Sequence, residues 1–230
     1  MKKLLLLLLT SYTLMANALP QSITTTIKSI DKNGQITLAT SVPKGMSGIV
    51  VHDYGNGLSA ITNAVITEKD GKATLLKYTA IPHDNIPNIK TASKVNDKVI
   101  LGNFYNNVLV IAPDATSYAN ITQKFKKTWI HPDRFAVDFM KNAQSAITLD
   151  NIEEFSKKNQ VGLVLIASKS ALYILDPISK TFIGKKDISV NTDKAMKPFF
   201  ARFKQMDTSV FGMSKVTLTD YDKAINNLIK

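Results

Sequence analysis

Residues 23–39, ITTTIKSIDKNGQITLA, place β-branched residues in alternation on both sides of a polar turn that contains Asn33-Gly34. Alternation with a period of two is typical of strands that bury one face, and Asn-Gly is typical of a tight hairpin turn. This stretch therefore predicts a β-hairpin, with a first strand over 23–29 and a return strand over 35–39.

A second hairpin is expected directly afterwards. Residues 58–67 and 72–80 flank a turn that contains Asp70-Gly71, a strong turn signal. Further short strands are expected at 49–51, 98–102 and 108–111. Six or more short strands joined by tight turns favour a small barrel or sandwich. We expect this β-rich module to span 19–113.

Helical patterns begin after Pro113. Three helices are expected, one capped by Asp114 or Thr116 and running towards Phe125, one starting at His131-Pro132-Asp133, and one starting at Thr148-Leu149-Asp150. Asp150 and Glu153 have the spacing of a capping box. Glu153-Glu154 with Lys157 and Lys158 indicate a solvated helix face with ion pairs between residues four apart.

Strands are then expected to return. Residues 161–167 form a continuous apolar run typical of a buried strand, and 171–175 and 181–189 follow it. The chain closes with an amphipathic helix whose apolar positions are Tyr221, Ala224, Ile225, Leu228 and Ile229. The sequence thus predicts an α+β fold, a β-rich barrel or sandwich followed over 114–230 by helices on a small antiparallel sheet.

The first eighteen residues have the layout of a secretory signal peptide. Lys2 and Lys3 precede the apolar run Leu4–Leu9, and Ala16-Asn17-Ala18 supplies small residues before a cleavage site. A retained anchor is the alternative, but a spanning helix needs roughly 20 apolar residues. We expect cleavage after Ala18, export to the periplasm, and no membrane-spanning segment in the remainder.

Composition narrows the function further. The chain has no cysteine, which excludes disulfides, thiol catalysis and Cys-rich zinc sites. Its net charge is +11, or +9 once Lys2 and Lys3 are removed. Export argues against nucleic acid as the partner of this charge. A solvated surface, or attraction to an anionic membrane, polymer or acidic protein, remains open.

The candidate catalytic and metal-binding residues are few. The three histidines each have an aspartate close behind, as His52-Asp53, His83-Asp84, and His131 with Asp133. Adjacent strand residues point to opposite faces, no metal-ligand spacing occurs, and His131-Pro132 favours a helix start. The sequence therefore predicts no metal, no cofactor and no catalytic residue.

The tetrapeptide Gly45-Met46-Ser47-Gly48 invites comparison with serine hydrolases. It misses the nucleophile-elbow pattern because Ile49 stands where the second glycine is required. A small-residue bend that leads into a strand is the favoured interpretation. A hydrolase that uses Ser47 with His52 is kept as the alternative.

Several segments together resemble a known family. They are Gly45–His52 with Tyr54-Gly55 and Ser59–Ile61, Asp97–Gly102 with Phe104-Tyr105, Ile111–Pro113 with Tyr118, His131–Asp133 with Phe135-Ala136, Val161–Leu163, and Tyr173–Asp176. The likeness, from about Ile23 to Phe203, is to the N-terminal domain of epsilonproteobacterial plasminogen-binding proteins. It implies a non-enzymatic protein. It also implies plasminogen as a partner, bound by a kringle through the ammonium and carboxylate of a terminal lysine, here Lys230.

The predicted compartment points to a different role. A periplasmic protein without an anchor is similar in compartment and size to the paralysed-flagellum components that build disks around the flagellar motor. The leading prediction is therefore a periplasmic scaffold or adaptor that binds other envelope or flagellar-motor proteins. Plasminogen binding through Lys230 is the alternative.

Overall fold

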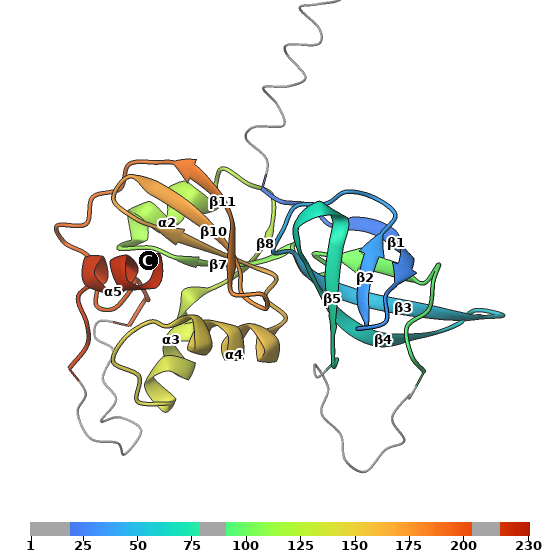
Figure 1. The fold of residues 1–230 in the computed structure, drawn as a ribbon. Helices are drawn as coiled ribbons and strands as arrows, with labels where there is room; N and C mark the ends of the chain where they lie inside the picture. The colour runs from blue at the N-terminus through green and yellow to red at the C-terminus, as the bar shows by residue number, and fades with distance from the viewer. Residues whose placement is uncertain (1–18, 79–90, 204–216) are drawn as a thin grey trace, which may run out of the picture.

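The computed structural model describes residues 19–78, 91–203 and 217–230, which form a barrel and a helix-covered sheet side by side (Figure 1). The predicted signal peptide, residues 1–18, lies outside the described residues, as does its cleavage site. Leu19, the first described residue, is buried where the two modules meet.

The N-terminal module is a closed barrel of six antiparallel strands in the order β1-β2-β5-β4-β3-β6. The strands are β1 (Ile23–Ile30), β2 (Gln35–Leu38), β3 (Ser47–Gly55), β4 (Leu58–Thr67), β5 (Lys72–Leu76) and β6 (Lys98–Leu101). Both predicted hairpins are confirmed, because β1 pairs with β2 and β4 pairs with β5. A single 3-10 turn, η1 (Lys69–Gly71), joins β4 to β5. The second return strand ends at Leu76, short of the expected 80, and residues 79–80 lie outside the described part.

Strand β6 closes the barrel by pairing with both β1 and β3. Alternate residues of the strands point inward, so Ile27, Ile36, Val50 and Val99 are fully buried. Gly48 is needed at the closure, because a Cβ atom there would lie 2.3 Å from the carbonyl oxygen of Ile100.

The second module is a five-stranded mixed sheet in the order β11-β10-β9-β7-β8. Its strands are β7 (Asn107–Ile111), β8 (Thr128–Ile130), β9 (Leu163–Ala167), β10 (Ala171–Asp176) and β11 (Thr181–Asp187). The prediction of an antiparallel sheet holds for β9, β10 and β11, whereas β7 runs parallel to β8 and β9. Residues 107–111 were predicted to belong to the β-rich module. Strand pairing instead makes them an interior strand of this sheet, between β9 and β8.

Helices cover both faces of the sheet. They are α2 (Ala115–Thr122), α3 (Pro132–Lys141), α4 (Leu149–Asn159) and α5 (Tyr221–Leu228). The predicted starts at Asp114 and His131 are confirmed, since both side chains cap their helices. The capping box of α4 is made by Thr148 and Asn151 rather than by Asp150 and Glu153.

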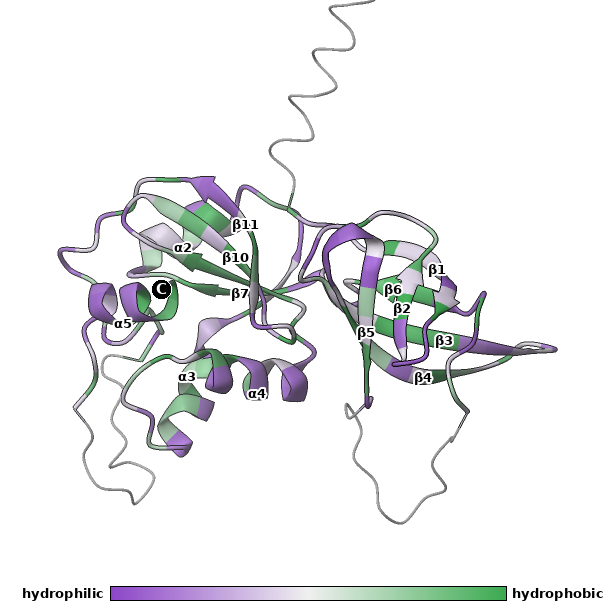
Figure 2. Ribbon diagram, in the orientation of Figure 1, coloured by the Kyte–Doolittle hydropathy of each residue, from purple (hydrophilic) through white to green (hydrophobic). Residues whose placement is uncertain are grey.

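Two hydrophobic cores result from this arrangement. One lies between the sheet and helices α3, α4 and α5. The other joins the barrel interior to the opposite sheet face, and contains Val50 and Val99 together with Val108 and Leu165. Hydrophobic strands accordingly run through both modules, while the outer sides of the helices are hydrophilic (Figure 2). Within the described ranges, no helix has the length and apolar character required to cross a membrane.

Substituting Gly48 with alanine should destabilise the fold. The added methyl group would meet backbone atoms of β6, which cannot rotate away, so we expect a loss of about 2 kcal/mol in the free energy of unfolding. Urea denaturation followed by circular dichroism measures it. Gly184→Ala is the matched control, because its Cβ would meet only the Ile174 side chain at 3.1 Å. Equal losses in both variants would contradict the close approach of β3 and β6.

Candidate functional site

The barrel and the sheet meet at the carboxylate of Asp176, the last residue of β10, which is fully buried. Five donors surround this group. Its Oδ2 atom accepts from Ser47 N at 2.7 Å, Ser47 Oγ at 2.8 Å and Tyr105 OH at 2.7 Å, and its Oδ1 atom accepts from Ile178 N and Ser179 N, each at 3.0 Å. We call Asp176 and its four donor residues, Ser47, Tyr105, Ile178 and Ser179, the Asp176 junction.

The surroundings of Tyr105 favour the protonated hydroxyl, which donates a hydrogen bond to Asp176. Burial, followed by the charge of Asp176 and the hydrogen bond to it, raises the pKa of Tyr105 well above its ordinary value. On the other side of the same residue, Lys127 Nζ donates to the Tyr105 carbonyl oxygen at 2.9 Å, and burial lowers the pKa of Lys127. A buried carboxylate is tolerated when donors satisfy it, so these contacts explain how Asp176 is held in the interior.

The junction also accounts for the small-residue bend at Gly45–Gly48. Ser179 Oγ donates to the Gly45 carbonyl oxygen at 2.6 Å. A Cβ atom at Gly45, where φ is +87°, would lie 2.4 Å from Thr181 Cγ2. The predicted bend is thus confirmed, and its small residues allow the start of β3 to approach the turn after β10.

Ser47 and His52 have different partners in the structure. The Ser47 hydroxyl donates to Asp176, whereas His52 Nδ1 lies 2.7 Å from Asp97 Oδ1. Asp53, next to His52, instead accepts from the backbone N–H of Gly55. Ser47, His52 and Asp53 are close together in the chain, but their side chains bond to different partners.

His131 has a structural role at the start of α3. Its Nδ1 atom accepts from Asp133 N at 3.2 Å, and the Asp133 carboxylate accepts from Arg202 Nε at 2.6 Å. Burial raises the pKa of Asp133, but the hydrogen bonds from Arg202 outweigh it and lower the pKa below its ordinary value. His83 and Asp84 lie outside the described residues. Among the residues that are described, no three histidines and carboxylates are grouped as a metal site.

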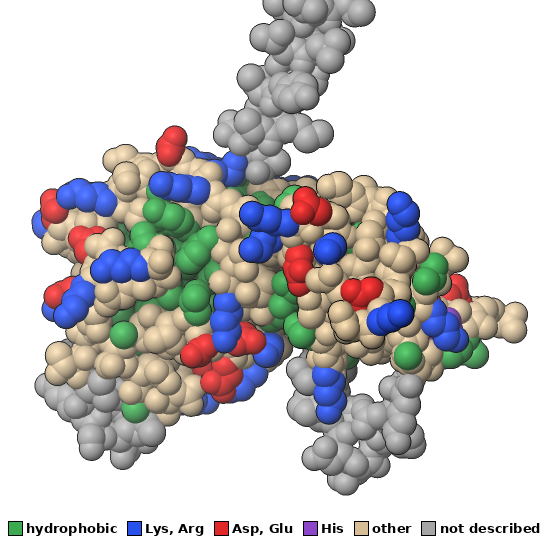
Figure 3. Space-filling model, in the orientation of Figure 1, with side chains coloured by type: hydrophobic (Ala, Val, Ile, Leu, Met, Phe, Trp, Pro, Cys, Tyr) green, Lys and Arg blue, Asp and Glu red, His purple; other side chains and the backbone are tan. Residues whose placement is uncertain are grey.

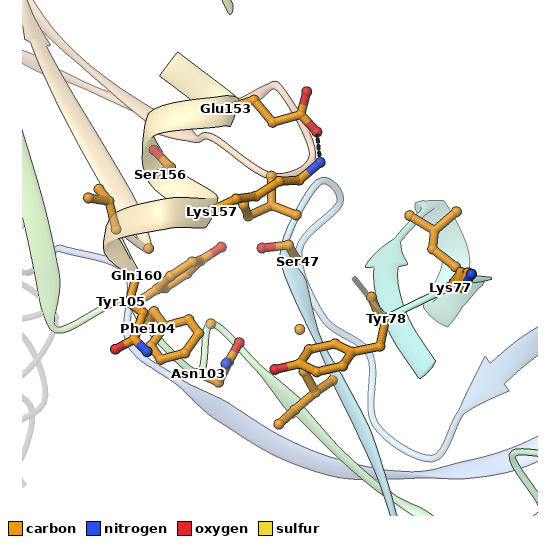
Figure 4. Close-up of a pocket in the computed structure, with 18 residues that line it drawn as sticks. Ser47, Lys77, Tyr78, Asn103, Phe104, Tyr105, Glu153, Ser156, Lys157 and Gln160 are labelled. Atoms are coloured by element: carbon orange, nitrogen blue, oxygen red, sulfur yellow. Dashed lines mark hydrogen bonds and ion pairs between the residues drawn. The ribbon is translucent and has the colours of Figure 1, made fainter. Parts of the chain in front are cut away.

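A cleft of about 150 Å³ opens beside the Asp176 junction, between the barrel and α4 (Figure 4). Its walls are mostly apolar. Strands β3, β4 and β5 contribute Ile49, Ala64 and Leu76, and the second module contributes Val161 and Ile178. Ser47, Tyr105 and Ile178 all line it, so the junction and the cleft share three residues.

Ion pairs neutralise the acidic residue at the α4 wall of the cleft. Glu153 lies 2.6 Å from Lys157 Nζ and 2.8 Å from Lys180 Nζ. Burial raises the pKa of Glu153, but the hydrogen bonds and charges of the two lysines outweigh it, so the pKa is lowered. The predicted i,i+4 pairs are confirmed, as Lys158 also bonds to Glu154.

Ser156 is unusual on the same wall. Its side chain is 1% exposed, and its Oγ atom has no hydrogen-bond partner among the described residues. The sequence predicted no role for the Ser156 or Asp176 side chains, and it did not predict the cleft. Asp176 ends an apolar strand, which was the available signal, but two of its donor residues, Ser47 and Tyr105, are distant in the chain.

The basic charge is spread over both modules rather than gathered at one site, with acidic side chains between the lysines and arginines (Figure 3). Lys185 is exposed, and its ammonium lies 5.2 Å from the centre of the Tyr173 ring. Lys230 is exposed and follows α5 by two residues.

The family model described as plasminogen-binding protein pgbA N-terminal matches residues 22–229. The chain belongs to this family. The resemblance inferred from separate segments is therefore confirmed, and the pgbA N-terminal match extends through both modules of the fold. No curated protein and no solved structure gives a match.

Asp176→Asn should strongly destabilise this pgbA N-terminal domain. The asparagine NH2 group would face donors that require an acceptor, so we expect a loss of about 3 kcal/mol in the free energy of unfolding. Tyr105→Phe, which removes one bond to the carboxylate, should cost about 2 kcal/mol. Urea denaturation measures both. Asp187→Asn, at the exposed end of β11, is the control and should cost less than about 0.5 kcal/mol.

Ser156→Ala should have the opposite effect. Removing a buried hydroxyl that lacks a partner, and placing alanine in a helix, should stabilise the protein by about 1 kcal/mol. Ser117→Ala is the matched control, because the Ser117 hydroxyl donates to Asp114 Oδ2 at 3.0 Å. If the unfolding midpoint shifts in the same direction for both variants, the conclusion that the Ser156 hydroxyl lacks a hydrogen-bond partner is contradicted.

Proposed function

We propose that this protein is a non-catalytic binding protein whose partner is plasminogen. The observation that carries the proposal is the family match over residues 22–229. The contacts of Ser47 support the non-catalytic part, because its hydroxyl donates to a buried carboxylate instead of to a histidine. The exposed lysines support the binding part, since a kringle recognises an ammonium group together with a carboxylate.

Lys230 is the residue proposed to make this contact. It is exposed and lies two residues beyond the end of α5. In a chain that ends at Lys230, the side chain and the terminal carboxylate present both charges on one residue.

Binding to plasminogen can be measured by surface plasmon resonance, with the protein immobilised through a peptide tag at its N-terminus. We expect saturable binding that 6-aminohexanoic acid abolishes, because this compound carries the same pair of charges. Lys230→Ala should weaken the binding at least tenfold. Lys223→Ala, which removes an equal charge from an exposed position of α5, should change it less than twofold. Binding that survives both the competitor and Lys230→Ala would refute the assignment.

A scaffold role in the periplasm is the second candidate, and one feature favours it. The β3–β4 hairpin extends beyond the barrel (Figure 1) and carries Tyr54 and Leu58, which are 50% and 67% exposed. Large exposed apolar side chains on a protruding hairpin suit contact with another protein. Assembly with envelope proteins, at the flagellar motor in its most specific form, would use such a contact.

Localisation separates the two candidates. Antibody should label intact cells if the protein captures plasminogen, and should require a permeabilised outer membrane if the protein is a periplasmic scaffold. Deleting the gene and imaging the motor tests the flagellar form. Normal swimming with an unchanged motor would exclude it.

A further inference from the structure

The cleft between the barrel and α4 has a wall built from neighbouring strands. Ile49 of β3 pairs with Ala64 of β4, and Ala64 pairs with Leu76 of β5, so the three lie in one row across the sheet. Val65, the next residue of β4, points into the barrel and is 1% exposed. The row therefore faces outward, and the small side chain of Ala64 leaves a hollow between two larger ones.

Three apolar side chains of the cleft are not part of the interior. Ile49, Leu76 and Phe104 are only partly buried or exposed, and in the described part of the chain they lie outside both hydrophobic cores. Leu76 is 40% exposed. Apolar surface that is left open at the meeting of two modules is typical of a binding site.

The volume decides what kind of group fits. Sites for whole small molecules usually measure about 300–1,000 Å³. The present cleft, at about 150 Å³, is of the size that accepts one benzene ring. It therefore suits a single aromatic or branched aliphatic side chain presented by a larger partner.

The rim indicates how the rest of that partner is recognised. The side-chain amides of Asn103 and Gln160 line the cleft and can each bond to a peptide group. Of the three charged lining residues, two are lysines, and Lys77 forms no ion pair within the described residues, whereas Lys157 is bound to Glu153. With a net charge of +11 on the whole chain, the rim favours acidic residues next to the inserted side chain.

We propose that this cleft is a docking site for an extended acidic segment of a partner protein, which inserts one apolar side chain between Ile49 and Leu76. The site is separate from Lys230, so the proposal does not depend on plasminogen binding. In Figure 4 the cleft is bordered by Tyr78 on the barrel side and by α4 on the other, which allows the segment to contact both modules.

The test is an NMR titration of the isotope-labelled protein with the blocked peptide acetyl-Glu-Asp-Phe-Asp-Glu-amide. We expect saturable shifts at the amides of Ala64, Leu76 and Phe104. Replacing the phenylalanine of the peptide by alanine, or its acidic residues by lysine, should weaken binding at least tenfold. If the amides of Ala64, Leu76 and Phe104 do not shift, the proposal is overturned.

Ala64→Phe tests the hollow directly, because the new ring would occupy it. This variant should bind the peptide at least tenfold more weakly, while Ser59→Phe, at an exposed position of the same strand, should bind it like the parent protein. Thermal unfolding of both variants checks that the fold is retained. Equal binding by Ala64→Phe and the parent would overturn the proposal, whereas plasminogen binding by Ala64→Phe should stay unchanged.

Two other occupants can be recognised by the same experiments. Nuclear Overhauser contacts from the Leu76 methyl groups to residues 79–90 in the peptide-free protein would mean that the chain fills its own cleft. A concentration-dependent dimer in analytical ultracentrifugation, lost in Ala64→Phe, would mean that a second copy fills it. Either result would overturn docking of an acidic partner.

Discussion

A carboxylate without access to water has to be surrounded by donors, and Asp176 obtains them from three separate parts of the chain. The start of β3 provides Ser47, the loop before β7 provides Tyr105, and the turn after β10 provides two backbone N–H groups. Because these donors come from both modules, the barrel is held in one position against the sheet. The cleft exists because these same segments, with α4, surround a space that no described side chain fills completely.

The shared hydrophobic core acts together with this junction. Barrel residues such as Val50 and sheet residues such as Val108 belong to one continuous cluster, so the two modules bury apolar surface against each other. In a protein without cysteine, such burial and the buried hydrogen bonds supply the stability that disulfides give to many exported domains. In the proposed binding role, a partner that contacts both modules would meet a surface that is already formed.

Local patterns predicted local structure well. The hairpin at 23–39, the turn at Asp70-Gly71 and the helix start at His131-Pro132 depend on residues close in sequence, and all are found in the structure. The direction of the sheet was predicted less well. Strand β7 is followed by a helix and then pairs in parallel with β8 and β9, and no short-range pattern distinguishes this from another barrel strand.

The sequence by itself determined the positions of most strands and helices, the absence of disulfides and the family to which the chain belongs. Only the tertiary structure showed that Ser47 bonds to a carboxylate 129 residues away, and that Ala64 lies between Ile49 and Leu76. The physical reason is that such contacts depend on the register between strands and on how one module packs on the other. Neither is encoded in the spacing of residues along a single strand.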